Sequence, residues 1–314
     1  MAGCGTQVID TTAAPPIVTA QEQTSGAGTV SSMKYAADNI SGSSPLFPNM
    51  IPVVSPGEAN NAPLPILTYV PSNPAGSNVN FTVILASNYN PAATNPWVMW
   101  IQGDGGLCAD IFNIAVDTQM ADGLLAAGYS LVCTDFTSQT DWGNPASGLD
   151  LTTALAQARL EFNLDPRPYV YAASMGGMRV LNAITHGIIQ PRAMEMAFPA
   201  YSMSNIYAGG SGGFNSQLQT AYSCSSVPTC NAAFVGYDPS APVSGATAAL
   251  INKVPMDVRC SASDTTINCA ANGQALVTAV TAAGGTATFT ACTGAHGDPS
   301  CVLPAAAIDY FNKH

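Results

Sequence analysis

Charged residues are scarce in this sequence, and basic residues most of all. Only 9% of the 314 residues are charged, and eight Lys and Arg stand against 19 Asp and Glu, giving a formal net charge of −11. The basic residues never cluster along the chain. Nucleic acids and anionic membrane surfaces are bound by clustered Lys and Arg, so this composition argues against both as partners.

The sequence also lacks a long apolar segment. No run approaches the roughly 18 residues that a membrane-spanning helix needs, so we expect no transmembrane segment. The first residues, Met-Ala-Gly-Cys, contain neither the charged region nor the apolar region of a signal peptide. Ala-Gly-Cys does match the end of a bacterial lipoprotein cleavage site, which would make Cys4 a point of lipid attachment.

Zinc-binding patterns are missing although nine cysteines are present, because the sequence has neither C-x-x-C pairs nor histidines near its cysteines in such a pattern. We predict disulfides instead, with free buried thiols as the alternative. Three pairs are close in sequence, and a fourth would join two adjacent strands of the sheet predicted below: Cys224–Cys230, Cys260–Cys269, Cys292–Cys301 and Cys108–Cys133, with Cys4 left over. Disulfides indicate an oxidising compartment, so we expect a secreted, periplasmic or cell-surface protein.

The chain divides into two regions that differ in amino-acid composition and in the periodicity of their apolar residues. Residues 1–60 are rich in Thr, Ser, Ala, Gly and Pro without sustained periodicity, which predicts an extended arm or linker. Residues 61–314 alternate apolar runs with helical patterns, which predicts a mostly parallel α/β sheet with helices on both faces. The pattern predicts strands at 64–70, 80–86, 97–102, 129–133, before Ser174, and at 193–198, 254–261 and 286–291, and helices at 111–127, 151–162, after Ser174, and at 270–283 and 303–312.

One stretch, YVYAASMGGMRV at residues 169–180, joins an apolar run to a helical pattern through Ser174. In a nucleophile elbow, a sharp strand-to-helix turn exposes one serine, and the residues two before and two after it must be small. Ala172 and Gly176 meet this requirement, with Ala172 in place of the usual first glycine. The alternative is a glycine-rich turn with an incidental serine, since such turns are common in α/β folds.

A serine becomes a nucleophile only when a base removes its proton and a third group orients that base. The sequence offers three histidines. His314 is the last residue, and His186 lies about 18 Å from Ser174 along the predicted helix, where a role at the helix C-terminus suits it. His296 directly follows a predicted strand and is therefore our candidate base.

Two aspartates compete for the role of the acid. Asp264 follows the predicted strand 254–261, and open α/β sheets place their sites at the carboxyl ends of strands. Asp257 lies in the middle of that strand, where a buried partner for Arg259 or for a backbone amide is the simpler role. We prefer Asp264 and predict a triad of Ser174, Asp264 and His296.

From about residue 63 onward the chain resembles the serine esterases and lipases of the α/β-hydrolase superfamily. The resemblance rests on Ala-Ala-Ser-Met-Gly at 172–176 for the elbow, Asp-Thr-Thr at 264–266 for the acid loop, and Gly-Ala-His-Gly at 294–297 for the histidine loop. The order Ser, Asp, His is also that of the superfamily. Gln-Gly-Asp-Gly-Gly at 102–106 resembles the oxyanion loop, with Gln102 where His is often found. In its general sequence character the chain most resembles secreted polyester depolymerases and feruloyl-esterase-like enzymes. Residues 1–60 have no counterpart in these enzymes.

This resemblance implies the α/β-hydrolase fold and acyl transfer through a serine ester. His296 would deprotonate Ser174, and backbone N–H groups would hold the tetrahedral oxyanion. The N–H of Met175 is one expected donor, and the second is expected from Asp104 or Gly105, with the Asp104 carboxylate pointing away. No metal or organic cofactor is expected.

The alternation of strand and helix patterns is interrupted over about residues 199–249. This segment is rich in glycine and aromatic residues, and we interpret it as an inserted lid. Tyr201 and Tyr207 of this insertion, together with Trp142, are predicted to line an apolar acyl pocket. The alternative is a minor core beneath the insertion.

Three functions fit these patterns. We favour a carboxylic ester hydrolase acting on a small-molecule or polymer ester. A peptidase or amidase on the same fold is the second reading. The third is a non-enzymatic surface or particle component that uses residues 1–60 for attachment, against which the complete triad argues.

Overall fold

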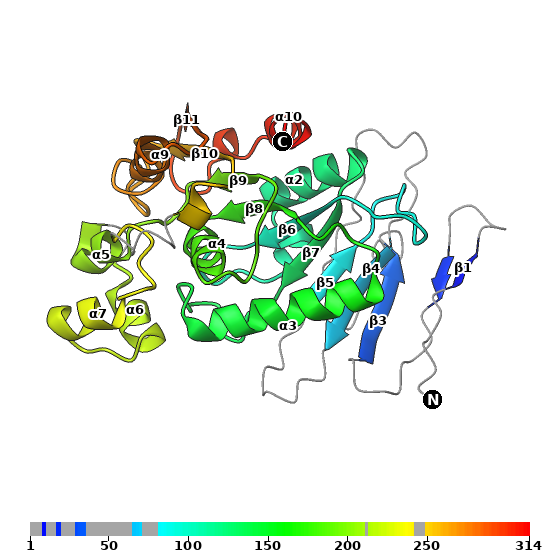
Figure 1. Cartoon of the computed structure of the whole chain (residues 1–314), viewed down its shortest axis with the longest axis horizontal. Helices are drawn as coiled ribbons and strands as arrows, with labels where there is room; N and C mark the ends of the chain where they lie inside the picture. Colours follow the sequence, from blue (N-terminus) through cyan, green and yellow to red (C-terminus); the bar gives the residue numbers. More distant parts are fainter. Residues whose placement is uncertain are drawn as a thin grey trace. The chain divides into compact units, whose positions relative to one another are not determined.

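The computed structural model of the chain describes residues 8–10, 17–19, 29–35, 65–70, 81–210, 213–241 and 249–314 (Figure 1). These residues fall into two compact units. The first comprises the described parts of Met1–Met99, Leu107–Thr137 and Thr152–Pro166, and the second those of Trp100–Gly106, Ser138–Leu151 and Arg167–His314. No helix in the described part of the chain is long and apolar enough to cross a membrane.

The first unit is built on antiparallel strand pairs. β3 pairs with β4, β4 with β5, and β5 with β7. Every residue of β5 and β7 is buried, including the hydroxyl residues Thr82, Ser130 and Thr134 among the apolar ones. The elements of this unit are β1 (Val8–Asp10), β2 (Ile17–Thr19), β3 (Thr29–Tyr35), β4 (Pro65–Val70), β5 (Phe81–Ile84), α1 (Asp110–Asn113), α2 (Ala115–Ala126) and β7 (Ser130–Thr134). β1 and β2 form a separate antiparallel pair, and β1 to β3 lie within the segment predicted to be an arm.

The second unit is built on parallel pairs. β8 pairs with β9, β9 with β10, and β10 with β11, all in parallel. Its strands are β8 (Tyr169–Ala173), β9 (Met194–Ala197), β10 (Met256–Ser261) and β11 (Ala287–Cys292), and its main helices are α4 (Met175–Thr185), α9 (Gly273–Ala282) and α10 (Pro304–Asn312). The parallel register brings the carboxyl ends of these strands to one edge, where Ser174, Asp264 and His296 follow β8, β10 and β11.

Two elements contribute residues to both units, namely β6 (Trp97–Ile101) and α3 (Pro145–Glu161). The succession of strands and helices along the chain from β6 to α10, with parallel pairing of β8 to β11, confirms the predicted α/β class.

Local chemistry shifted several predicted boundaries. The helix expected at 111–127 is broken at Ile114, whose extended backbone separates α1 from α2. The helix expected from residue 151 begins at Pro145, because the Asn144 side chain accepts a hydrogen bond from the Ser147 N–H and proline suits the first helical position. The apolar pattern therefore revealed residues 151–161 of this 17-residue helix and missed its first turns.

All four predicted disulfides are present, with Cα–Cα distances of 5.6 Å for Cys108–Cys133, 4.9 Å for Cys224–Cys230, 5.6 Å for Cys260–Cys269 and 5.2 Å for Cys292–Cys301. One detail was wrong. Cys108 lies in a turn between β6 and α1 rather than on a strand, so the first bridge joins a loop to β7. Cys4 lies outside the described residues.

The segment at 199–249 contains short helices with a core of their own. They are α5 (Met203–Asn205), the π-helical turn Ile206–Gly210, α6 (Asn215–Ala221) and α7 (Val227–Ala233). Apolar side chains from these helices form one buried cluster with Trp142, Met175 and Met178. The insertion is therefore packed directly on the start of α4.

Candidate active site

Ser174 lies at the turn between β8 and α4 with backbone angles of φ 54° and ψ −124°. This left-handed φ is uncommon for a residue with a side chain and marks local strain. Hydrogen bonds hold the conformation, because the Ser174 N–H donates to Ala197 O at 3.0 Å and its carbonyl accepts from the N–H groups of Gly177 and Ala200. The turn also requires glycine at 176, where a Cβ atom would lie 2.3 Å from the carbonyl oxygen of Ile101.

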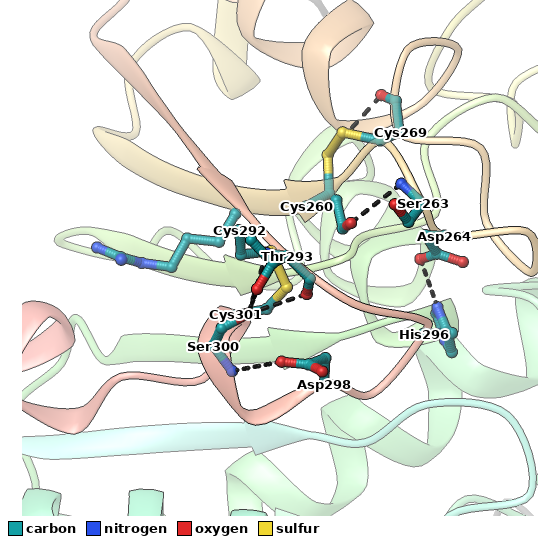
Figure 2. The surroundings of a disulfide bond; sticks show 12 residues. Cys260, Ser263, Asp264, Cys269, Cys292, Thr293, His296, Asp298, Ser300 and Cys301 are labelled. Carbon is teal, nitrogen blue, oxygen red and sulfur yellow. Dashed lines mark hydrogen bonds and ion pairs between the residues drawn. A yellow bond between two sulfur atoms is a disulfide. The ribbon is translucent and has the colours of Figure 1, made fainter.

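The structure brings the three predicted triad residues together. His296 Nε2 lies 2.9 Å from Ser174 Oγ. On the other side of the ring, His296 Nδ1 lies 2.7 Å from Asp264 Oδ2, and Figure 2 shows this second contact. Each residue comes from a different loop at the same edge of the parallel strands. The imidazole can therefore accept the serine proton at Nε2 while the carboxylate holds Nδ1–H.

The surroundings of Asp264 favour its ionised form. Burial alone would raise the pKa of this carboxyl, but hydrogen bonds from His296 and from the backbone N–H groups of Ile267 and Thr266 outweigh it and lower the pKa below its ordinary value. Its contribution to stability is therefore present above the pKa of the unfolded chain and is lost as the pH falls through the folded value. At neutral pH the carboxylate is charged and able to orient His296.

The competing acid, Asp257, is engaged elsewhere, as its mid-strand position suggested. Arg259 donates to Asp257 Oδ2 and to Glu195 Oε1, both at 2.6 Å. Burial and the nearby Asp257 carboxylate raise the pKa of Glu195 to about 8. The single guanidinium of Arg259 opposes this rise but is shared between the two carboxylates, so it does not cancel it. His186 also lies outside the site, with Nδ1 2.9 Å from the carbonyl oxygen of Asn182.

The two candidate oxyanion donors after β6 differ in their hydrogen bonds. The N–H of Gly105 donates to Gln139 O at 3.1 Å and is therefore occupied. The N–H of Asp104 has no such partner in the described part of the chain. Gly103 packs so closely on the nucleophile that a Cβ atom there would lie 3.0 Å from Ser174 Cβ. This geometry favours Asp104 over Gly105 as the second donor, beside Met175 at the start of α4.

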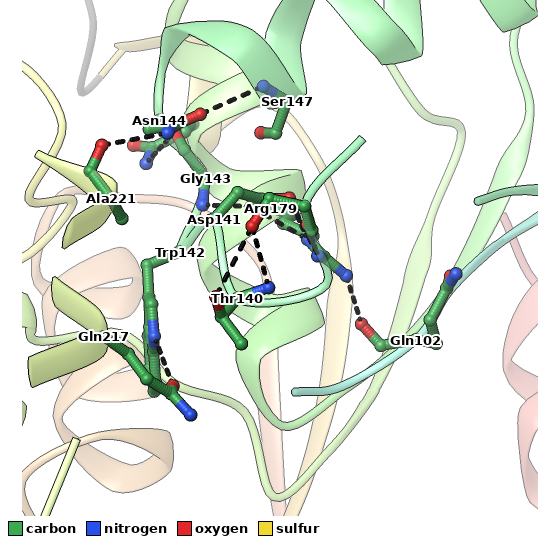
Figure 3. Close-up of polar contacts among 12 residues, drawn as sticks. Gln102, Thr140, Asp141, Trp142, Gly143, Asn144, Ser147, Arg179, Gln217 and Ala221 are labelled. Atoms are coloured by element: carbon green, nitrogen blue, oxygen red, sulfur yellow. Dashed lines mark hydrogen bonds and ion pairs between the residues drawn. The ribbon is translucent and has the colours of Figure 1, made fainter. Parts of the chain in front are cut away.

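An ion pair that was not predicted from the sequence connects α4 to the segment between β7 and α3. Arg179 of α4 is buried and donates Nε and Nη2 to the carboxylate of Asp141, at 2.8 to 3.1 Å (Figure 3). It also donates to the carbonyl oxygens of Gln102 and Ser138, both at 3.1 Å. The signal that was available is a single arginine in an otherwise apolar stretch of helix.

Phe198 is a second residue that the sequence did not reveal. It follows β9 with φ 40°, and its ring packs against the imidazole of His296 with centroids 4.6 Å apart. This contact places an apolar ring, tilted by 58°, against the imidazole. A phenylalanine at a strand end has no sequence signal that separates it from an ordinary core residue.

The three predicted pocket aromatics are buried. Trp142 is 0%, Tyr207 5% and Tyr201 7% exposed, and the first two belong to the apolar cluster beneath the insertion. Tyr201 lines a cavity of about 320 Å³ together with Ile251, Leu276 and other mainly apolar residues, and Ser174 does not line that cavity. The arrangement favours the alternative of a minor core over an acyl pocket at the nucleophile. No group of three metal-ligating side chains is found among the residues described.

Comparisons with known proteins place the fold. No family model and no curated protein sequence matches the chain. Among solved structures, a Bacteroides ovatus protein regarded as a dipeptidyl aminopeptidase IV aligns with a TM-score of 0.59 and 13% identity, over 80% of this chain and only 36% of its own length. A Thermogutta terrifontis esterase aligns at 0.53 and 14% over 77% and 88%, and a ferulic acid esterase at 0.58 and 14% over 79% and 98%. The chain has the α/β-hydrolase fold.

The two aspartates can be separated by mutation. We expect Asp264→Asn to lower kcat by several orders of magnitude, because the amide no longer stabilises the imidazolium or fixes its tautomer. Asp257→Asn should mainly lower the thermal unfolding temperature, since it weakens the contact with Arg259. Kinetics and thermal melts of both variants test this, and the reverse pattern would assign the acid to Asp257.

The Cys292–Cys301 bridge is expected to serve the position of His296. It joins the two ends of the loop that carries His296. Ser300 Oγ links the same two ends by donating to Thr293 O at 2.9 Å (Figure 2). A loop of about ten residues closed by a disulfide removes about 2.5–3 kcal/mol of unfolded-chain entropy. During a reductant titration, activity should fall before the circular dichroism signal changes.

The matched variants are Cys292→Ala/Cys301→Ala and, as the control, Cys224→Ala/Cys230→Ala in the insertion, which removes a bridge of similar span. The first should lose activity at temperatures where it is folded, and the second should keep it. Coincident loss of activity and structure in the first variant would mean that the bridge acts through stability alone.

Proposed function

We propose that this protein is a serine hydrolase that cleaves carboxylic esters through an acyl-enzyme intermediate. The observation that carries the proposal is the position of His296, whose two ring nitrogens lie 2.9 Å from Ser174 Oγ and 2.7 Å from Asp264 Oδ2. The strained backbone of Ser174 adds support, because such strain is a feature of nucleophile elbows.

In the proposed reaction, His296 Nε2 takes the hydroxyl proton as Ser174 Oγ attacks the ester carbonyl. The N–H groups of Met175 and Asp104 donate to the oxyanion that forms, and the loss of one such donor typically removes about 3 kcal/mol of transition-state stabilisation. His296 then protonates the leaving alcohol. Water, activated by the same imidazole, attacks the acyl-enzyme, and the returning proton regenerates Ser174.

The insertion carries almost no charge, which argues against a charged specificity pocket formed by this segment. Residues 199–249 contain one charged residue, Asp238. That carboxylate is buried and accepts hydrogen bonds from the N–H groups of Met203 and Ser204, so it is committed to the insertion itself. An esterase acting on a neutral small-molecule or polymer ester is consistent with this composition.

A peptidase or amidase remains the second candidate, because the structural neighbours include an aminopeptidase as well as esterases. The same triad would attack an amide carbonyl, and the difference lies in protonation of a poorer leaving group. The four disulfides support a site of action in an oxidising compartment, so we propose a secreted, periplasmic or cell-surface enzyme, with residues 1–60 as its arm.

Substitution of the nucleophile tests the proposal. Ser174→Ala should retain the fold and abolish both turnover of short p-nitrophenyl esters and covalent labelling by a fluorophosphonate. An organophosphorus reagent is a suitable probe, because the Thermogutta esterase has been solved phosphonylated by sarin. Ser225→Ala, a change at an exposed serine of the insertion, is the control and should label normally.

Parallel assays on p-nitrophenyl esters and peptide p-nitroanilides distinguish the candidate functions. Faster turnover of esters supports the proposal, and faster turnover of anilides supports a peptidase. Absence of turnover and labelling in the wild-type protein would favour the non-enzymatic alternative. Persistent labelling of Ser174→Ala would assign the chemistry to another serine.

A further inference from the structure

Three polar side chains form a hydrogen-bonded series that reaches the candidate oxyanion loop. The indole Nε1 of Trp142 donates to Gln217 Oε1 at 2.9 Å, and Gln217 Nε2 donates to Asp104 Oδ2 at 3.1 Å. Figure 3 shows the Trp142 indole facing the Gln217 amide. Gln217 belongs to α6, so the series joins the insertion to the residue whose N–H we assign to the oxyanion.

The series has one consistent direction. An indole N–H is only a donor, so it must face the amide oxygen of Gln217. The NH₂ group is thereby left for Asp104, and an ionised carboxylate is only an acceptor. Trp142 is fully buried, and its ring packs against Phe214 with centroids 5.0 Å apart, so the donor at the start of the series is fixed.

The Asp104 carboxylate depends on this bond. Its second oxygen, Oδ1, is buried without a hydrogen-bond partner in the described part of the chain. Gln217 is thus the side chain that the described residues supply to hold the carboxylate. A buried carboxylate oxygen without a donor is unfavourable, and losing the remaining bond would free the side chain to rotate. A rotated carboxylate near the developing oxyanion would repel it.

Residue 104 is held on both sides by neighbours of the same loop. Gly103 packs against Ser174, and the Gly105 N–H donates to Gln139 O at 3.1 Å. Gln139 and Trp142 both belong to the segment between β7 and α3. The peptide that carries the Asp104 N–H is therefore fixed by Gly103, by Gly105 and, through its side chain, by Gln217.

The helix that carries Gln217 is itself anchored to this segment. Asn144 Nδ2 donates to Ala221 O at 2.9 Å, and the Tyr222 hydroxyl donates to Trp142 O at 3.1 Å. Leu218, the next residue after Gln217, is buried in the cluster beneath the insertion. These contacts fix the position of α6, and with it the position of Gln217 relative to Asp104.

We propose that Gln217 is a positioning residue of the oxyanion hole: by holding the Asp104 carboxylate, it aims the Asp104 N–H at the oxyanion and keeps the negative charge away. The inference rests on the proposed function. Through Gln217 the insertion would affect the rate of acyl transfer, in addition to packing against α4. Because the oxyanion exists only in the transition state and the tetrahedral intermediate, the effect belongs to kcat rather than to KM.

The test compares two glutamines of one helix. Gln217→Met keeps the length of the side chain and removes its hydrogen bonds. Gln219→Met is the control, because Gln219 Nε2 donates to the Tyr207 hydroxyl instead, at 3.0 Å. With a p-nitrophenyl ester, we expect Gln217→Met to lower kcat roughly ten- to a hundredfold with little change in KM, and Gln219→Met to change neither.

A boronic acid that forms a tetrahedral adduct with the serine provides the second readout. Its affinity should fall with kcat in Gln217→Met, and a purely structural role would not produce this correlation. Asp104→Ala/Gln217→Met should be no slower than Gln217→Met, because the released carboxylate is gone; a much slower double variant would contradict the proposed charge effect.

Two failures can be told apart. If the wild-type protein hydrolyses esters and Gln217→Met matches Gln219→Met in kcat, or loses activity only in proportion to its unfolded fraction, the positioning role is overturned and the proposed function stands. If the wild-type protein neither turns over esters nor labels with a fluorophosphonate, the proposed function falls, and the positioning role falls with it.

Discussion

The close approach between the nucleophile turn and the end of β6 is the constraint on which the rest of the site depends. Gly176 allows α4 to begin against the carbonyl oxygen of Ile101, and Gly103 allows the following loop to lie against Ser174. The resulting turn places Ser174 in a strained conformation, which hydrogen bonds with Ala197, Ala200 and Gly177 hold. Any larger side chain at these contacts would displace the nucleophile from His296.

The arrangement of the candidate site could be predicted because its residues are few and their positions along the chain are restrictive. With three histidines in the sequence, a base for Ser174 could be chosen by elimination. Parallel strands place the residues that follow them at one edge, and this rule favours Asp264, which follows a strand, over Asp257, which lies within it. The α/β class could be predicted because each strand and helix is recognised from its own pattern of apolar residues, and the two kinds of pattern alternate along the chain.

Contacts between distant segments could not be predicted in this way. Arg179 meets Asp141 across 38 residues, and Gln217 meets Asp104 across 113. Periodicity identifies which face of an element is apolar but does not name the partner of a polar side chain. The aromatics of the insertion illustrate a second limit, since an apolar pocket and a minor core call for the same residues. The buried position of Trp142 separates the two, and that burial depends on how α6 packs.

The cluster beneath the insertion has a consequence for how this protein can be altered. Met175 and Met178 of the nucleophile helix supply part of that cluster, and Met203, Leu218 and Phe234 of the insertion supply the rest. The insertion is therefore not a module that can be exchanged on its own. A segment grafted from another protein of this fold would leave voids or clashes against the first turns of α4, directly beside Ser174. Changes of specificity in this region must therefore arise by small, volume-matched steps, with the helix and the insertion adapting together.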